Sequence, residues 1–239
     1  MTRRDTANAL PGSRLVPMLA AMLLALAFAV APARAAVTIQ EVTSGRGVTA
    51  WLVEDYTVPI VSVRFAFKGG STQDPEGKEG IATLITGLFD EGAGDLDSDA
   101  FQEQLDDVGA EMSFDATRDA IYGQMRMLAD AREEAFGLLQ LALTAPRFDQ
   151  EPVDRIRSQI VTRIQRSMRD PNTLGREAFA RALYGEHPYA RPSDGTPESL
   201  ASVTPDDLKE LHRRLFARSN ISVAVVGAID AETLAAELD

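Results

Sequence analysis

The chain has 239 residues, with 24 Lys or Arg against 36 Asp or Glu and a formal net charge of −12. This acidity disfavours nucleic acids and anionic membrane surfaces as partners, because both are polyanions. The chain has no cysteine and only two histidines, His187 and His212. Disulfides, thiolate zinc sites, cysteine nucleophiles and histidine-rich catalytic centres are therefore excluded.

Residues 1–35 have the features of a secretory signal peptide. A basic region holds Arg3, Arg4 and Arg14. An almost uninterrupted apolar run over residues 15–30 follows, and Ala33-Arg34-Ala35 is a small-residue cleavage signal before Ala36. A membrane anchor is the alternative, but the run is short for a span of ~20 residues and ends at the cleavage signal. No cysteine follows that could carry a lipid, so we expect export, to a bacterial periplasm, without a stable membrane anchor after cleavage.

Residues 36–239 are enough for one domain, and removal of four basic residues and one acidic residue leaves them a net charge of −15. Apolar residues at the strand period, or in short runs bounded by turns, predict strands over 37–42, 49–54, 58–67, 111–116, 120–128 and 221–226. Helical spacing and capping residues predict helices over 79–89, 99–108, 130–143, 150–169, 174–184, 205–216 and 231–238. Ser98 or Asp99 is the predicted cap of the second helix, and residues 185–197 form a Gly- and Pro-rich loop.

Hairpins followed by helices predict an α+β fold, with a largely antiparallel sheet and helices packed on one face. The last predicted helix stops at Asp239. We therefore expect a domain that is truncated at its C-terminus.

Five segments share residues with one protein family, in the family's order. They are residues 45–54, Val61 with Val63, Phe67, Gly70 and Ser71, then Glu79-Gly80-Ile81-Ala82, then Phe148-Asp149 with Arg157, Ile164 and Asp170-Pro171, and finally His187-Pro188-Tyr189 with Gly195, Leu208, Leu215 and Val225-Val226-Gly227. Together they resemble the M16 (insulinase/pitrilysin) zinc peptidases. The resemblance covers the whole mature chain and implies an M16, or LuxS/metallohydrolase-like, domain. One departure is Ala228, which stands where the family has an aspartate.

The resemblance also shows what the chain lacks. Residues 80–91 align with the family's Gly-Leu-Ala-His-x-x-Glu-His, which places Thr83, Thr86 and Gly87 at the two ligands and the general base. The downstream carboxylate ligand and its supporting glutamate align with Arg163 and Ile156. A threonine hydroxyl is a poor zinc ligand, glycine has no side chain, and a protonated arginine repels a cation. We predict no catalytic residue and no metal in this chain, with zinc only in a catalytic partner.

The remaining candidate residues receive structural interpretations. We expect His187 to be a loop residue and His212 to be a solvent-exposed helix residue. Residues 95–99 faintly resemble a calcium loop, but Ala100 replaces its turning glycine and Asp106 its bidentate glutamate. A polar helix start is the preferred interpretation of that segment.

The resemblance implies the non-catalytic subunit of an exported M16 assembly, which binds and encloses extended peptide together with a catalytic M16 partner. The residues expected to contact peptide or partner are Ser113, Phe114, Asp115, Ala116 and Thr117. A stand-alone peptide-binding or scaffold protein is a second hypothesis. A metallopeptidase with an unconventional site is the third.

Overall fold

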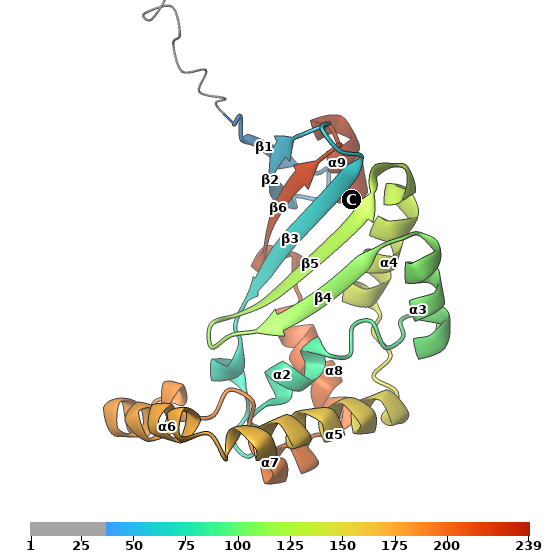
Figure 1. The fold of residues 1–239 in the computed structure, drawn as a ribbon. Coiled ribbons are helices and arrows are strands. Elements are labelled where there is room, and N and C mark those ends of the chain that lie inside the picture. The colour runs from blue at the N-terminus through green and yellow to red at the C-terminus, as the bar shows by residue number, and fades with distance from the viewer. Residues whose placement is uncertain (1–36) are drawn as a thin grey trace, which may run out of the picture. The chain divides into compact units, whose positions relative to one another are not determined.

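A six-stranded sheet is the centre of the fold in the computed structural model, which describes residues 37–239 (Figure 1). The predicted signal peptide lies outside the described residues. The strands are β1 (Gln40–Thr43), β2 (Thr49–Glu54), β3 (Ile60–Lys68), β4 (Glu111–Ala116), β5 (Ala120–Leu128) and β6 (Ile221–Gly227). Their order across the sheet is β1-β2-β6-β3-β5-β4, and only the β2–β6 pair is parallel.

The helices are interspersed with the strands along the chain, and all but the one at residues 197–201 are predicted by the sequence. In the described residues they are α2 (Ile81–Thr86), α3 (Ser98–Asp107), α4 (Arg132–Thr144), α5 (Gln150–Ser167), α6 (Pro171–Tyr184), α7 (Pro197–Ala201), α8 (Pro205–Leu215) and α9 (Ala231–Glu237). Short 3-10 turns are η2 (Ser71–Gln73), η3 (Ala129–Ala131), η4 (Pro188–Ala190) and η5 (Arg218–Asn220).

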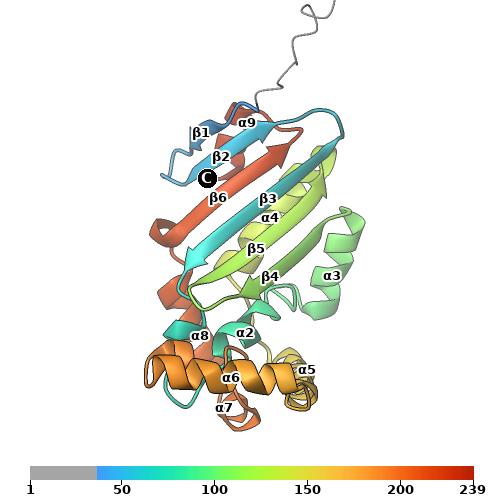
Figure 2. The same ribbon diagram turned by 60° about the vertical axis from the view of Figure 1, so that its left-hand side comes forward.

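The two faces of the sheet differ in burial. Helices α3, α4 and α9 lie over one face, while α2, α5, α7 and α8 gather beyond the end where β3 finishes and β4 turns into β5 (Figures 1 and 2). Along β3 and β5, residues on the covered face are buried and their neighbours are exposed or partly exposed. This alternation is the strand periodicity of the sequence, and it confirms the α+β fold with one covered face.

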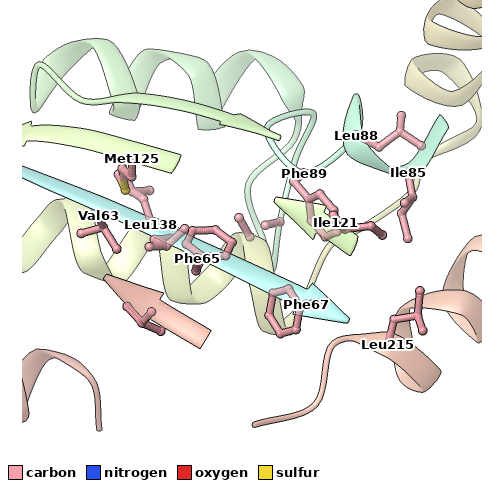
Figure 3. Packing of buried hydrophobic residues seen from close by; sticks show 14 of the residues in the cluster. Val63, Phe65, Phe67, Ile85, Leu88, Phe89, Ile121, Met125, Leu138 and Leu215 are labelled. Carbon is pink, nitrogen blue, oxygen red and sulfur yellow. The ribbon is translucent and has the colours of Figure 1, made fainter. Parts of the chain in front are cut away.

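The core is formed by the covered face, the helices above it and the helices at its end. Val63, Phe65 and Met125 of the sheet are buried with Leu138 of α4 (Figure 3). Phe89, which follows α2, is fully buried, with its ring centroid 4.5 Å from that of Phe114 and 4.8 Å from that of Phe216. This aromatic cluster fixes the end of α2 against the edge of the sheet.

Several predicted boundaries are wrong by a few residues. The helix predicted over 79–89 is only Ile81–Thr86, because Gly80 has φ 91° and Gly87 ends the helix. Neither Ser98 nor Asp99 caps α3, since the Asp97 carboxylate accepts the Ala100 N–H at 3.0 Å. The predicted loop 185–197 contains the turn η4, and Pro197 begins α7.

Other boundaries agree closely with the sequence patterns. Strands β4 and β5 have the predicted bounds, and β6 is one residue longer than predicted. Within residues 37–239, no helix has both the length and the apolar character to span a membrane.

Candidate functional site

The short helix α2 is held at its start by a buried carboxylate. Asp74, which is 5% exposed, accepts hydrogen bonds from the backbone N–H groups of Gly80 at 2.7 Å and Ala82 at 3.2 Å. Burial raises the pKa of Asp74 to about 7, although these two N–H donors act in the opposite direction. Arg191 adds a bond from its guanidinium to the Asp74 carbonyl at 3.2 Å. The sequence analysis missed Asp74, because nothing in its local pattern distinguishes it from a surface loop residue.

Glycines allow a loop to approach the start of α2. A Cβ on Gly80 would lie 2.3 Å from the carbonyl oxygen of Asp194, and one on Gly195 would lie 2.0 Å from the carbonyl oxygen of Glu79. Both glycines also have positive φ, at 91° and 76°. Only glycine at both positions permits this contact between backbones that are distant in sequence.

The two threonines of the degenerate motif use their hydroxyls inside the protein. Thr83 donates to the carbonyl oxygen of Ser193 at 3.1 Å and lies 3.5 Å from a carboxylate oxygen of Asp194. Thr86 is buried and donates to the carbonyl oxygen of Thr83 at 2.8 Å. Each hydroxyl therefore stabilises local structure.

The glycine of the motif packs directly against α5. A Cβ on Gly87 would lie 2.8 Å from Cγ2 of Ile156, closer than normal van der Waals contact. Ile156 is partly buried against the hydrophobic core. Its side chain therefore occupies the space that a larger residue at position 87 would need.

Arg163 completes the set of positions taken from the family alignment. Its guanidinium Nε lies 3.5 Å from a carboxylate oxygen of Asp194, and both side chains are about half exposed. Asp194 thus lies between Arg163 of α5 and Thr83 of α2. The structure brings together the two segments of the degenerate site, with Gly87 beside Ile156 and Thr83 linked through Asp194 to Arg163.

These residues do not fit a zinc ion. They offer hydroxyls that are already hydrogen-bonded, an apolar side chain, a guanidinium and one carboxylate that pairs with that guanidinium, whereas zinc needs imidazole, thiolate or carboxylate ligands. Across residues 37–239, no group of three or more His, Cys, Asp or Glu side chains is arranged to hold a metal.

The two histidines have structural contacts. His187 is exposed and its Nδ1 accepts the Tyr189 N–H at 3.2 Å, which agrees with a loop role. The prediction that His212 is solvent-exposed is wrong. Its Nε2 lies 2.9 Å from the carbonyl oxygen of Leu143, its ring stacks on Phe216 at 5.1 Å, and burial lowers its pKa. The charged neighbours in the sequence concealed that His212 follows Leu208 by one helical turn and shares its buried side.

The residues predicted to contact peptide lie on the outer strand β4 and its turn. Ser113 and Asp115 are exposed, while Phe114 and Ala116 point toward the core and are partly buried. Thr117 belongs to the turn, where its N–H donates to the Ala120 carbonyl and its own carbonyl accepts the Ser71 N–H. The turn is therefore anchored to the neighbouring loop, and only the strand offers unpaired backbone groups.

The pairing register of β4 with β5 identifies the unpaired backbone groups of β4. Thr117 and Ala120 form a hydrogen-bonded pair of the hairpin, and such pairs alternate along an antiparallel ladder. The N–H and C=O groups of Met112, Phe114 and Ala116 consequently point away from β5. Among the described residues, none of these groups bonds to another segment.

Comparisons with known proteins identify the family. The model of the insulinase family, peptidase family M16, matches residues 50–196. The chain belongs to the M16 family. A Helicobacter pylori protein named non-peptidase homolog YmxG is 23% identical over 80% of this chain and 44% of its own length. Other relatives carry the name uncharacterized zinc protease.

Solved structures have the same fold. A Pseudomonas fluorescens protein described as a peptidase M16 inactive domain has a TM-score of 0.79 and 28% identity, over 84% of this chain and 49% of that one. The periplasmic protease PqqL from Escherichia coli has a TM-score of 0.74 at 18% identity, over 84% of this chain and 23% of PqqL. The chain spans less than half of the length of these curated relatives. The names non-peptidase and inactive agree with an inactive M16 homologue, and the sequence contains no His-x-x-Glu-His.

Proposed function

We propose that this chain is the non-catalytic subunit of an exported M16 peptidase assembly, which binds extended peptide and encloses it together with a catalytic M16 partner. The observation that carries the proposal is the degenerate site. Ile156, at the position of the supporting glutamate, packs against Gly87 at one ligand position, and Thr83 and Arg163, at the other two ligand positions, both contact Asp194. Zinc belongs to the catalytic partner in this proposal.

The outer edge of β4 provides the peptide-binding mode. A peptide that adds to this edge as a further strand would bond to the outward backbone groups of Met112, Phe114 and Ala116. Its side chains would lie beside Ser113 and Asp115 on the open face. This mode requires no metal, because backbone hydrogen bonds supply the affinity.

Export to the periplasm is part of the proposal. Its support is the basic region, apolar run and cleavage signal of residues 1–35, together with a similar fold in a protein described as a periplasmic protease. The net charge of −15 on residues 36–239 favours basic peptides.

A stand-alone peptide-binding protein is the second candidate, since the β4 edge can bind a strand without any partner. A hydrolase with an unconventional site is the third. The environments of the histidines count against it, since His212 bonds to the Leu143 carbonyl in an aromatic cluster and His187 Nδ1 accepts a backbone N–H.

The test uses a quenched fluorescent peptide rich in Lys and Arg and a catalytic M16 homologue with an intact His-x-x-Glu-His from the same cell. The chain alone should not hydrolyse the peptide, and its addition should raise the rate of the homologue. Ala116→Pro removes an outward N–H and should weaken peptide binding about 2- to 12-fold, as expected for one hydrogen bond of about 0.5 to 1.5 kcal/mol, whereas Ala116→Val keeps the N–H and adds similar bulk.

Three outcomes would contradict the proposal. Chelator-sensitive hydrolysis by the chain alone would make it an enzyme. Peptide binding without any effect on the homologue would favour the stand-alone protein. Equal peptide affinity of the A116P and A116V variants would exclude the β4 edge as the binding site.

A further inference from the structure

Helix α6 exposes a continuous apolar face, although it belongs to the ordered fold. Leu174, Ala178 and Ala182 follow each other at steps of four residues, and Phe179 with Leu183 forms the adjacent row. The three large side chains are 44%, 66% and 58% exposed for Leu174, Phe179 and Leu183, and α6 buries no residue. We call these five residues the α6 stripe.

The opposite side of α6 makes the contacts with the rest of the chain. Thr173, Glu177 and Ala180 are partly buried and line a cavity of about 480 Å³ shared with α5 and residues 190–195. The helix is held at its ends, where Asp170 accepts the Asn172 N–H and the Tyr184 ring packs edge-on against Tyr189 at 5.4 Å. The α6 stripe faces outward, because the opposite side of α6 makes the contacts with the rest of the chain.

A contiguous exposed apolar surface on a folded chain is a candidate interaction site. The exposed aromatic residues of the open sheet face, Trp51 and Tyr122, are different, because Arg64 and Arg126 lie on the same face. The α6 stripe has no charged residue within it. Helix α6 also lies beside the degenerate site, since residues 193 and 194 line the cavity on its inner side and contact Thr83 (Figure 2).

Charge indicates which kind of partner fits. Residues 163–191 contain six arginines and three acidic residues, while residues 36–239 as a whole have a net charge of −15. Arg176 and Arg181 lie on α6 itself, so two copies joined through this helix would bring like charges together. The basic border favours a different chain whose apolar surface is flanked by carboxylates.

We propose that the α6 stripe docks the catalytic M16 chain of the assembly, and this inference rests on the proposed function. A partner bound at α6 would lie close to the degenerate site, because residues 193 and 194 line the α6 cavity and also contact Thr83. Its contact would bury Phe179 and Leu183 at the centre, where aromatic and aliphatic anchors contribute most of the affinity.

The experiment measures the affinity of the full chain for the catalytic M16 homologue of the same cell by isothermal titration. Phe179→Asp with Leu183→Asp should weaken binding about 100-fold. The matched control is Tyr56→Asp with Val58→Asp, two similarly exposed residues in the β2–β3 loop at the other end of the sheet, and it should change binding less than about twofold. Hydrogen exchange of the wild-type complex should show protection of the α6 amides, which tests the surface without a substitution.

The outcomes separate the two proposals. Equal binding by the stripe variant, without protection of α6, would overturn the docking surface and leave the proposed function standing. No binding by the wild-type chain would overturn the partnership itself, and the docking surface with it. If the wild-type chain forms a homodimer and the stripe variant does not, the α6 stripe binds a second copy of this chain and not the catalytic partner.

Discussion

The contact between Gly87 and Ile156 gives the sharpest test of how the degenerate site is packed. Gly87 has φ −89° and ψ 11°, which alanine adopts without strain, so Gly87→Ala should act mainly through its new Cβ. That Cβ would lie 2.8 Å from Cγ2 of Ile156 and 3.9 Å from Cγ1. Ile156→Leu keeps the volume of the side chain and removes the branched methyl group that clashes.

The two opposing effects of Gly87→Ala can be estimated. Carbon atoms pack at about 3.5 to 4.0 Å, so the new methyl group overlaps Ile156 by ~1 Å, and overpacking of this kind costs about 1 to 3 kcal/mol. The alanine also reduces the entropy of the unfolded chain, which stabilises the fold by about 0.4 to 1 kcal/mol. We expect Gly87→Ala to lower the free energy of unfolding by about 1 to 2 kcal/mol.

The assay is a double-mutant cycle measured by urea denaturation. Ile156→Leu alone should cost less than about 1.5 kcal/mol, and the double variant should be more stable than the sum of the two changes predicts by at least ~1 kcal/mol. Additive effects of the two changes would refute the reasoning, because they would mean that the methyl group of Ile156 does not meet the new Cβ.

Two further predictions concern Asp74 and zinc. Burial raises the pKa of Asp74 from 3.8 to about 7. The folded state therefore binds this proton more tightly than the unfolded chain. The stabilisation is complete below about pH 4 and is lost as the pH rises through about 7, by up to about 4 kcal/mol at ~1.4 kcal/mol per pKa unit. Urea titrations over this pH range should show a larger loss in the free energy of unfolding for the wild-type chain than for Asp74→Asn. If the free energy of unfolding of the two proteins changes in parallel with pH, the pKa of Asp74 is not raised. The wild-type chain should retain almost no zinc after dialysis. The variant T83H/T86E/G87H/R163E should bind well under one equivalent of zinc per chain, and addition of Ile156→Ala should raise the bound zinc. One full equivalent of zinc without Ile156→Ala would show that Ile156 does not block the site.

The sequence predicts the fold where local patterns and global packing agree. The alternating residues of β4 and β5, with a short polar turn between them, specify both strands and their pairing. The predicted loss of ligands also needs only the identity of the aligned residues. No local pattern, however, could predict that Asp194 lies between Thr83 and Arg163, because this contact joins residues 111 positions apart.

The errors have a common cause, which is tertiary context. His212 has charged neighbours in sequence but shares the buried side of α8, where Phe89 and Phe148 from two other segments, and Phe216 at the end of α8, lie against its ring. The motif helix is shorter than its apolar pattern predicts, because Gly80 must let a distant loop approach and Gly87 must make room for α5. Local periodicity contains no information about such approaches between distant segments.

The packing of the degenerate site shows why its change is difficult to reverse. A larger residue at position 87 meets Ile156, and a residue without a hydroxyl at position 83 leaves the Ser193 carbonyl without this donor. A carboxylate at position 163 would face Asp194, where two like charges repel each other. Each position is now stabilised by a neighbour from another segment, so single reversions cost stability before any ligand set is complete. The residues at these positions therefore form one packed arrangement with structural roles.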